Sequence, residues 1–299
     1  MARRIVGAEV QIITYEEFLP ALLGASAPSA DGYNYSSGLT PAITQAFAHA
    51  TYRFGHSTLS PQLQLINDDG TSSGSLDLRN VFFNPSVLSG DPNHVELLLK
   101  GAVTQRAQKI DNLLVDDVRN FLFGQPGSGG LDLASLNVQR GRDHGLPDYN
   151  LLRIAYSLPK QISFSQITSD ANLQQDLMDL YDNDIDNIDA WVGALAEDHV
   201  AGSSAGELMH AIIGNQFERL RDGDRLFYLS DDLGLYTSGI LDSDIASIID
   251  LDTVRLSDVI LANTPITNIP QNVFVVPEPA SGVLLPMLLL LSCRRRRSR

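Results

Sequence analysis

Apolar residues recur at three- and four-residue steps along most of this chain, which is the spacing of one buried helix face. Residues 2–24 carry the pattern at Ile5, Ala8, Ile12, Tyr15 and Leu19. Residues 38–57 repeat it, with Thr40 as the expected N-cap and Pro41 as the expected first helical residue. Further helices are expected to begin at Asp91 and Asp111. Strand-like alternation is rare; residues 61–74 form one short extended segment with a turn at 67–70. The pattern predicts a mainly α-helical protein.

Two histidines lie on the helix predicted for residues 38–57. His49 and His56 are seven residues apart and would share a helix face, while Gly55 removes a side chain beside His56. A histidine next to glycine leaves room for a flat ligand to approach. The alternative is a core histidine that is hydrogen-bonded to a backbone carbonyl, and at this point both interpretations stay open.

The charge of the chain excludes one class of partner. The 299 residues carry a formal net charge of −15 although five of the last six residues are arginine. Such an acidic body offers no basic groove for phosphates, so nucleic-acid binding is not expected. The single cysteine, Cys293, excludes an intrachain disulfide and a cysteine metal site.

The most polar helical segment is residues 136–150, Leu-Asn-Val-Gln-Arg-Gly-Arg-Asp-His-Gly-Leu-Pro-Asp-Tyr-Asn. Gly145 and Pro147 mark the end of one helix and the start of another. So many polar side chains between apolar ones need partners in the fold. Composition alone is compatible with a salt-bridged helix junction.

The same segment resembles the signature of the animal haem peroxidase superfamily, which includes myeloperoxidase, peroxinectin and cyclooxygenase. Four further blocks, in the same order, are similar to this family: residues 4–20, 52–56, 187–193 and 216–225. The resemblance extends over about residues 2–270 and implies a mainly α, animal haem peroxidase-like helical domain, present in part and with few short strands.

The resemblance also implies site residues. His56 corresponds to the axial ligand of the haem iron, and the cofactor is expected to be a b-type haem. Asn137 corresponds to the hydrogen-bond partner of that histidine, with its amide oxygen as acceptor for the second ring nitrogen. Arg53 and Arg140 are candidates to bind the haem propionates, with structural ion pairing as the alternative. His49 is expected to be structural.

Some functional residues of the family have no counterpart here. In the family, the distal histidine and arginine, the haem-linking carboxylates and a calcium loop lie upstream of the block that begins at Arg4. No catalytic distal residue is therefore expected in this chain, which resembles the proximal, C-terminal half of a peroxidase domain, from a truncated or decayed gene. The alternating Asp182, Asp184 and Asp186 do not form an EF-hand, because the required glycine and glutamate are missing. The calcium site of the family is not expected here.

The C-terminus suggests export. Residues 271–279 form a linker that ends in Val-Pro-Glu-Pro, and residues 280–293 are apolar and precede four arginines. This order resembles a PEP-CTERM sorting signal, which implies an exported cell-surface or extracellular protein. It also implies transient membrane attachment and an exosortase-type processing enzyme. The alternative is a plain tail anchor. No N-terminal signal peptide is recognised, since charged residues interrupt the first apolar segment.

The expected function is that of a haem-dependent peroxidase, which reduces hydrogen peroxide and oxidises a halide or a small organic donor. Loss of half the pocket predicts weak haem retention and little turnover. Two alternatives are a non-catalytic, peroxinectin-like surface or adhesion module and a haem-dependent fatty-acid oxygenase.

Overall fold

The first 23 residues form a nearly continuous helical rod in the computed structural model, which describes residues 1–91, 93–124 and 130–274. Helix α1 (Ala2–Ile13) passes through a π-helical turn (Thr14–Phe18) into α2 (Leu19–Leu23). Its buried residues include Ala8, Ile12, Tyr15 and Leu19, so the predicted helix face is confirmed. The rod ends at Gly24, whose φ of +73° suits glycine, and a Cβ there would lie 2.2 Å from the Gly202 carbonyl oxygen.

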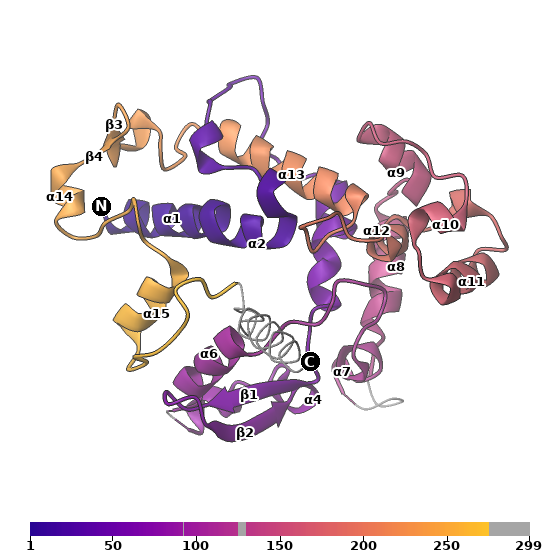
Figure 1. Ribbon diagram of the computed structural model, residues 1–299, viewed down its shortest axis with the longest axis horizontal. Coiled ribbons are helices and arrows are strands. Elements are labelled where there is room, and N and C mark those ends of the chain that lie inside the picture. Colours follow the sequence, from indigo (N-terminus) through magenta and orange to yellow (C-terminus); the bar gives the residue numbers. More distant parts are fainter. Residues whose placement is uncertain (92, 125–129, 275–299) are drawn as a thin grey trace, which may run out of the picture.

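Most of the remaining described chain consists of short helices joined by loops (Figure 1). The α-helices are α3 (Gln45–His49), α4 (Leu78–Val81), α5 (Ser86–Ser89), α6 (His94–Thr104), α7 (Asp116–Arg119), α8 (Leu133–Asp143), α9 (Tyr149–Ala155), α10 (Phe164–Ile167), α11 (Ala171–Leu180), α12 (Ala190–Ala196), α13 (Glu207–Asp222), α14 (Ser243–Ala246) and α15 (Leu256–Asn263). The 3-10 helices are Gly24–Ser26, Ala30–Gly32, Thr51–His56, Ile185–Asn187 and Asp231–Leu233.

The extended segment forms a hairpin. Strands β1 (Gln62–Ile66) and β2 (Ser72–Asp77) pair antiparallel around the turn expected at residues 67–70. Helix α6 packs closely on β1, and a Cβ on Gly101 would lie 1.9 Å from the Gln64 carbonyl oxygen. A second, two-residue pairing joins β3 (Tyr236–Thr237) to β4 (Ile240–Leu241). The described chain therefore has little strand, as expected.

Helix α13 runs beside the N-terminal rod (Figure 1), and aromatic side chains lie between them. The Tyr15 hydroxyl donates to the Phe217 carbonyl oxygen at 2.7 Å, and the two rings meet edge to face with centroids 6.0 Å apart. This contact belongs to the main core. A smaller cluster of Val103, Ile260 and Ile266 joins α6 to the C-terminal segment.

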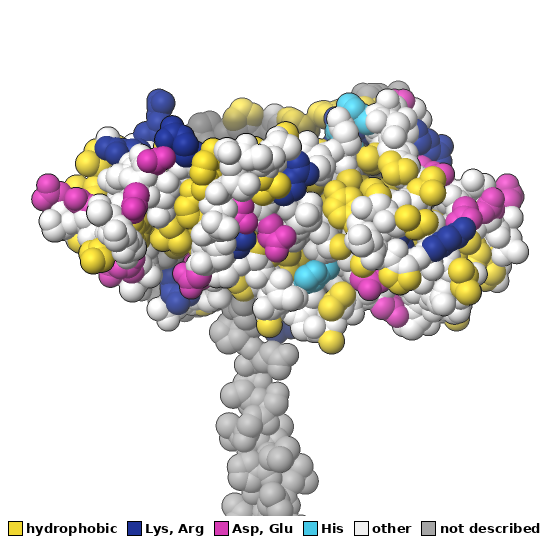
Figure 2. Space-filling view, turned by 90° about the horizontal axis from the view of Figure 1, so that it is seen from above, with side chains coloured by type: hydrophobic (Ala, Val, Ile, Leu, Met, Phe, Trp, Pro, Cys, Tyr) yellow, Lys and Arg dark blue, Asp and Glu magenta, His cyan; other side chains and the backbone are white. Residues whose placement is uncertain are grey.

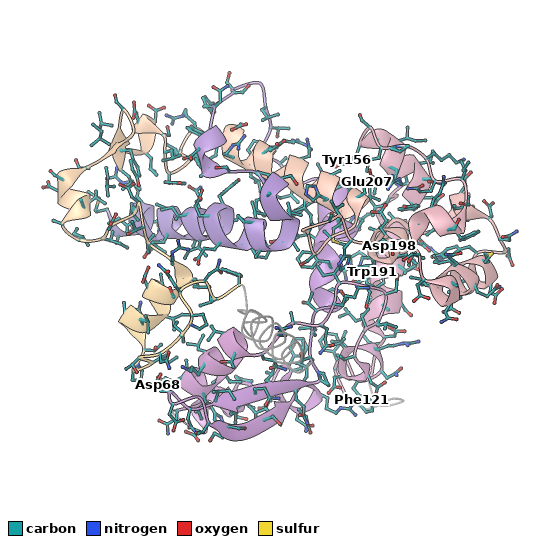
Figure 3. All side chains as sticks on the ribbon, in the orientation of Figure 1. Asp68, Phe121, Tyr156, Trp191, Asp198 and Glu207 are labelled. Atoms are coloured by element: carbon teal, nitrogen blue, oxygen red, sulfur yellow. The ribbon has the colours of Figure 1, made fainter. Side chains whose placement is uncertain are left out.

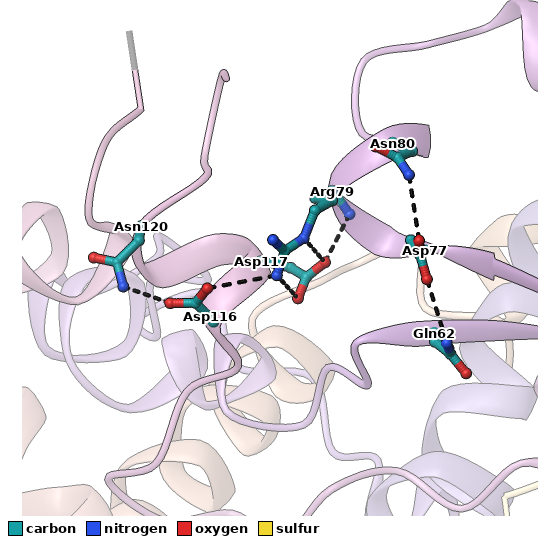
Figure 4. A network of polar contacts seen from close by, with 7 residues as sticks. All are labelled: Gln62, Asp77, Arg79, Asn80, Asp116, Asp117 and Asn120. Carbon is teal, nitrogen blue, oxygen red and sulfur yellow. Dashed lines mark hydrogen bonds and ion pairs between the residues drawn. The ribbon is translucent and has the colours of Figure 1, made fainter. Parts of the chain in front are cut away.

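The buried carboxylate of Asp117 links α7 to α4, the helix that follows β2 (Figure 4). Asp117 accepts hydrogen bonds from the Arg79 backbone N–H at 3.0 Å, from its Nε at 2.9 Å and from its Nη2 at 3.1 Å. The Arg79 guanidinium also lies 4.0 Å from the centre of the Phe121 ring. Charge-assisted bonds of this kind are about twice as strong as neutral ones, so α4 and α7 are held together firmly.

Two predicted helix starts differ from the structure. The helix expected from Asp111 is wrong over its first turn, because residues 111–115 are irregular and α7 begins only at Asp116. Asn112 donates to the Val192 carbonyl oxygen at 3.0 Å, a tertiary contact that holds this segment against α12. The helix expected from Asp91 begins at His94.

Apolar and charged side chains are interspersed on the face of the molecule in Figure 2. No helix in the described ranges is long and apolar enough to cross a membrane. The sorting signal expected within residues 271–299 lies almost wholly outside the described residues, which stop at Phe274.

Candidate functional site

The segment that carries His49 and His56 is two short helices with a break between them. Helix α3 begins after Thr44, whose hydroxyl accepts from the Phe47 N–H at 3.2 Å, and Ala50 interrupts it at φ −111° and ψ −82°. The 3-10 helix Thr51–His56 follows. The single helix predicted from Thr40 is therefore wrong.

A distant helix explains this difference. On α13, Gln216 accepts from the Thr44 N–H at 2.9 Å and donates to the Ala42 carbonyl oxygen at 3.2 Å. Arg219 donates to the Thr40 carbonyl oxygen at 3.0 Å. Three backbone groups of residues 40–44 are thus satisfied by α13 instead of by a helix of their own.

His56 is half-buried at the end of the 3-10 helix and faces α8. Its Nδ1 lies 2.7 Å from Nδ2 of Asn137, which is fully buried. Burial lowers the pKa of His56 and the nearby Arg53 lowers it further, while the Asn137 contact opposes both. The ring is therefore held neutral near pH 7, the form in which imidazole binds metals.

Arg53 contacts both Asn137 and His49. Its Nη1 donates to Asn137 Oδ1 at 2.9 Å, its Nε donates to the Ala48 carbonyl oxygen at 3.1 Å, and its Nη2 lies 3.4 Å from Nδ1 of His49. The structure therefore brings His56, Asn137 and Arg53 into one cluster. The amide orientation differs from the expected one, since the oxygen of Asn137 faces Arg53 and its nitrogen faces His56.

A pair of histidines and a second arginine lie near Arg53. The His49 ring stacks on His144 with centroids 4.0 Å apart, and Arg140 lies near enough to lower the pKa of Arg53, after burial the second cause. Burial lowers the pKa of His49, and His144 and both arginines add to this. Among the described residues, no carboxylate pairs with Arg53, Arg140 or His49. The two arginines therefore leave a local positive charge in an otherwise acidic protein.

A small cavity lies behind this cluster, between α8 and α12. Its volume is ≈ 100 Å³, and His49, Asn137, Asp189 and Trp191 are among the residues that line it. The buried Nε1 of Trp191 has no partner among the described residues. A cavity of this size suits water or a small molecule rather than a large ligand.

Two other polar residues of the 136–150 segment, Arg142 and Asn150, make structural contacts. Arg142 donates to both carboxylate oxygens of Asp189 at 2.8 Å, and Asn150 bonds Gln161 and Asp186. Gly145, with φ +64°, lies between α8 and α9. The junction predicted at Gly145 is therefore present, and it carries ion pairs as well as the cluster around Asn137.

A buried ionic network on α9 was missed from the sequence. Arg153 is fully buried and pairs with Glu197 and with Glu207, the first residue of α13 (labelled in Figure 3). The Tyr149 hydroxyl also donates to Glu197 at 2.7 Å, and Leu208 N–H donates to its other oxygen at 2.6 Å. The available signal was an arginine among Leu151, Leu152 and Ile154, four residues after Tyr149 on the same helix face.

The sequence profile described as animal haem peroxidase matches residues 1–274. This chain belongs to the animal haem peroxidase family. Peroxinectin A of Dictyostelium discoideum is 42% identical over 227 residues, which are 76% of this chain and 41% of that protein. Thyroid peroxidase of Mus musculus is 35% identical over 286 residues, which are 91% of this chain and 30% of that protein.

A solved structure supports the same assignment. Peroxidase A from Dictyostelium discoideum superposes with a TM-score of 0.79 at 37% identity, over 89% of this chain and 48% of that one. A fatty acid alpha-dioxygenase from Arabidopsis thaliana superposes with a TM-score of 0.71 at 20% identity, which shows a shared fold alone. The family and the mainly helical fold predicted from the sequence are confirmed. This haem peroxidase family member spans less than half the length of Peroxinectin A, thyroid peroxidase and Peroxidase A.

Proposed function

We propose that this chain binds a haem through His56 and provides the iron-holding side of a peroxidase that reduces hydrogen peroxide. The contact between His56 and Asn137 carries the proposal, since a metal-bound histidine almost always donates its other ring N–H to an acceptor, and the Asn137 amide lies at that nitrogen and is such an acceptor when its oxygen faces the ring. The burial of Asn137 fits this role, because a buried amide cannot turn away into solvent.

The charged groups around the cluster fit the rest of a haem. Arg53 and Arg140 would hold the propionate carboxylates, to which guanidinium groups bind well. The bound haem iron would supply the redox chemistry of peroxide reduction. The residues of the chain would hold the iron from one side, orient the imidazole and neutralise the carboxylates.

The proposal extends to the whole unit of residues 1–270 as one peroxidase-type domain portion with b-type haem. It assigns no residue of this chain to proton transfer at peroxide or to a calcium site. The electron donor would be a halide or a small organic molecule. Within the described residues, no group of three or more His, Cys, Asp or Glu could hold a metal ion by itself.

A haem titration followed by absorbance tests the proposal. The wild-type chain should give the spectrum of a histidine-bound ferric haem, and His56→Gln should lose it. His94→Gln, on α6, is the matched control and should leave the spectrum unchanged. Asn137→Leu should weaken haem binding by about 10- to 100-fold, the usual effect of removing such a hydrogen-bond partner. A His56→Gln variant with the wild-type spectrum would refute the assignment.

The alternatives make different predictions in the same experiment. A non-catalytic surface module, in line with the relative named Peroxinectin A, would show no haem uptake by the wild-type chain. A haem-dependent fatty-acid oxygenase would bind haem and consume oxygen with a fatty acid rather than peroxide with a donor.

We also propose export to the cell surface, with processing at the tail by an exosortase-type enzyme. The support is the order of Val276-Pro-Glu-Pro279, an apolar stretch and an arginine cluster. Alanine at Pro277 and Pro279 should keep the chain in the membrane fraction of a host that has such an enzyme. Unchanged release into the medium would contradict the proposal.

A further inference from the structure

A cavity of ≈ 420 Å³ lies where the β1–β2 hairpin, α6 and the segment after α15 meet. This volume is within the range of about 300–1,000 Å³ that is usual for small-molecule sites. Its lining is partly apolar and partly charged, and includes Ile66, Ile266, Asp68, Asp91, Glu96 and Lys100. None of the residues that cluster around His56 lines it. The cavity is therefore separate from the proposed haem site, and its charged groups need an explanation of their own.

The side chain of Lys100 is buried in this wall, and its ammonium group makes no hydrogen bond. The side chain is 7% exposed, and Nζ lies 3.7 Å from Oδ1 of Asp68, which is beyond hydrogen-bond distance. That Oδ1 atom already accepts from the N–H groups of Thr267 at 2.9 Å and Asn268 at 3.2 Å (Asp68 is labelled in Figure 3). Within the described part of the chain, no oxygen accepts a hydrogen bond from Nζ. An ammonium group has three donors, so Lys100 can bind an anionic group that enters the cavity.

Glu96 presents the opposite charge one helical turn before Lys100. Its Oε2 is buried and has no hydrogen-bond partner among the described residues. A glutamate followed four residues later by a lysine is well placed to form an ion pair on a helix, yet the ion pair of Lys100 is with Asp68 and not with Glu96. Leaving a buried charged group without partners costs free energy. Two opposite charges that are unsatisfied separately, in the wall of one cavity, are complementary to a ligand that carries both charges.

We propose that this cavity binds an apolar α-amino acid in its zwitterionic form. The ligand carboxylate would bind Lys100, and the ligand ammonium would bind Glu96. The carboxylate of Asp91, which also lines the cavity, adds to the attraction for the ammonium group. The apolar side chain of the ligand would pack on Ile66 and Ile266. A ligand with only one of the two charges would leave either Lys100 or Glu96 unsatisfied, which should weaken its binding about 10- to 100-fold.

Equilibrium dialysis of the full chain with radiolabelled L-leucine tests the proposal near neutral pH. The chain should retain the label, and unlabelled L-leucine should displace it. Two competitors of the same shape lack one charge each: isocaproate has no ammonium group, and isoamylamine has no carboxylate. Each should need about 10- to 100-fold higher concentrations than leucine to displace the label. No retention of labelled leucine, or a one-charge competitor as effective as leucine, would overturn the proposal.

Two variants assign the two charges. Lys100→Met removes the ammonium group but keeps the apolar stem, and Glu96→Gln removes the carboxylate charge but keeps the shape. Each should weaken leucine binding about 10- to 100-fold. In Lys100→Met, isoamylamine should compete at least as well as leucine, and in Glu96→Gln, isocaproate should do so. The matched control Lys109→Met changes an exposed lysine outside this cavity and should bind leucine like the wild-type chain.

Wild-type affinity for leucine in either variant would overturn the proposal. If Lys100→Met does not fold, Glu96→Gln and the two competitors on the wild-type chain still decide the question. The site needs no haem, so His56→Gln should bind leucine like the wild-type chain. A chain that binds haem through His56 but no leucine would refute this site alone. A chain that binds leucine but no haem would refute the proposed function alone.

Discussion

Gly193 should be intolerant of even a methyl group, although it lies within helix α12. A Cβ built on Gly193 would lie 2.4 Å from Cδ2 and Cγ of Tyr149 and 2.8 Å from its Cβ. The Tyr149 ring is fully buried, and its hydroxyl donates to Glu197 at 2.7 Å, so the ring cannot swing aside. The clash therefore has to be relieved by moving α9 and α12 apart.

The expected cost follows from two opposing effects. Overpacking a core by one methyl costs about 1–3 kcal/mol, and the fixed ring puts Gly193→Ala near the upper end of that range. Alanine in place of a helical glycine contributes about 0.5–1 kcal/mol in the other direction. Gly193→Ala should therefore lower the free energy of unfolding by about 2 kcal/mol.

Gly214, in the middle of α13, is the matched control. A Cβ there meets no atom within 4 Å. Gly214→Ala should raise the free energy of unfolding by about 0.5–1 kcal/mol through helix propensity alone. The two variants make the same chemical change in helices, and the packing predicts opposite signs.

Urea unfolding followed by fluorescence measures both variants directly. The chain has a single tryptophan, Trp191, which lies two residues from Gly193 and is buried, so its emission reports on the affected helix. Two alanine variants of equal stability, or a Gly193→Ala variant more stable than wild type, would show that the contact with Tyr149 does not limit the packing of α12.

Three further predictions follow from buried carboxylates. Glu197→Gln should lower the free energy of unfolding, measured in urea, by about 3 kcal/mol. This is the low end for a broken buried ion pair, because Arg153 keeps Glu207 as a partner. A loss below about 1 kcal/mol would contradict the prediction. Burial raises the pKa of Glu17, so its contribution to stability is fully present below the unfolded pKa near 4.5 and is lost as pH rises through the folded pKa. The stability of Glu17→Gln relative to wild type should therefore increase with pH above 4.5. A stability difference between the two proteins that does not change with pH would refute this prediction. Hydrogen bonds from Arg79 lower the pKa of Asp117, so Asp117→Asn should lower the free energy of unfolding by about 1–3 kcal/mol at pH 7. The stability difference from wild type should shrink as pH falls below 3.8. A loss of stability that is independent of pH would count against the ion pair.

The sequence predicted elements whose structure depends on local packing. The face of α1 followed from apolar spacing because each of its residues packs on the same core, and the turn between β1 and β2 followed from its Asn-Asp-Asp-Gly composition. The family blocks identified His56 and Asn137, and the structure brings these two residues into contact. Their roles toward haem remain predictions that the titration tests.

What the sequence could not predict depends on partners far along the chain. The segment 40–44 has a good helix start, yet Gln216 and Arg219 bind its backbone from more than 170 residues away. The direction of the Asn137 amide is set by Arg53, a contact between residues 84 positions apart. No local spacing contains such information, because the competing hydrogen-bond partner exists only after the chain has folded.

The 187–193 block and the 136–150 segment form one structural unit, which explains why the latter contains so many polar residues. The Tyr149 N–H donates to the Ile188 carbonyl oxygen at 2.8 Å, and Arg142 forms its ion pair with Asp189. Gly193 receives the Tyr149 ring. These contacts bind α8 and α9 to α12, and on α8 the Asn137 amide contacts His56. The segment is therefore both a salt-bridged junction and one wall of the proposed haem site, and because α12 also packs on the 3-10 helix Thr51–His56, a substitution at Gly193 that moves α12 should disturb the site as well.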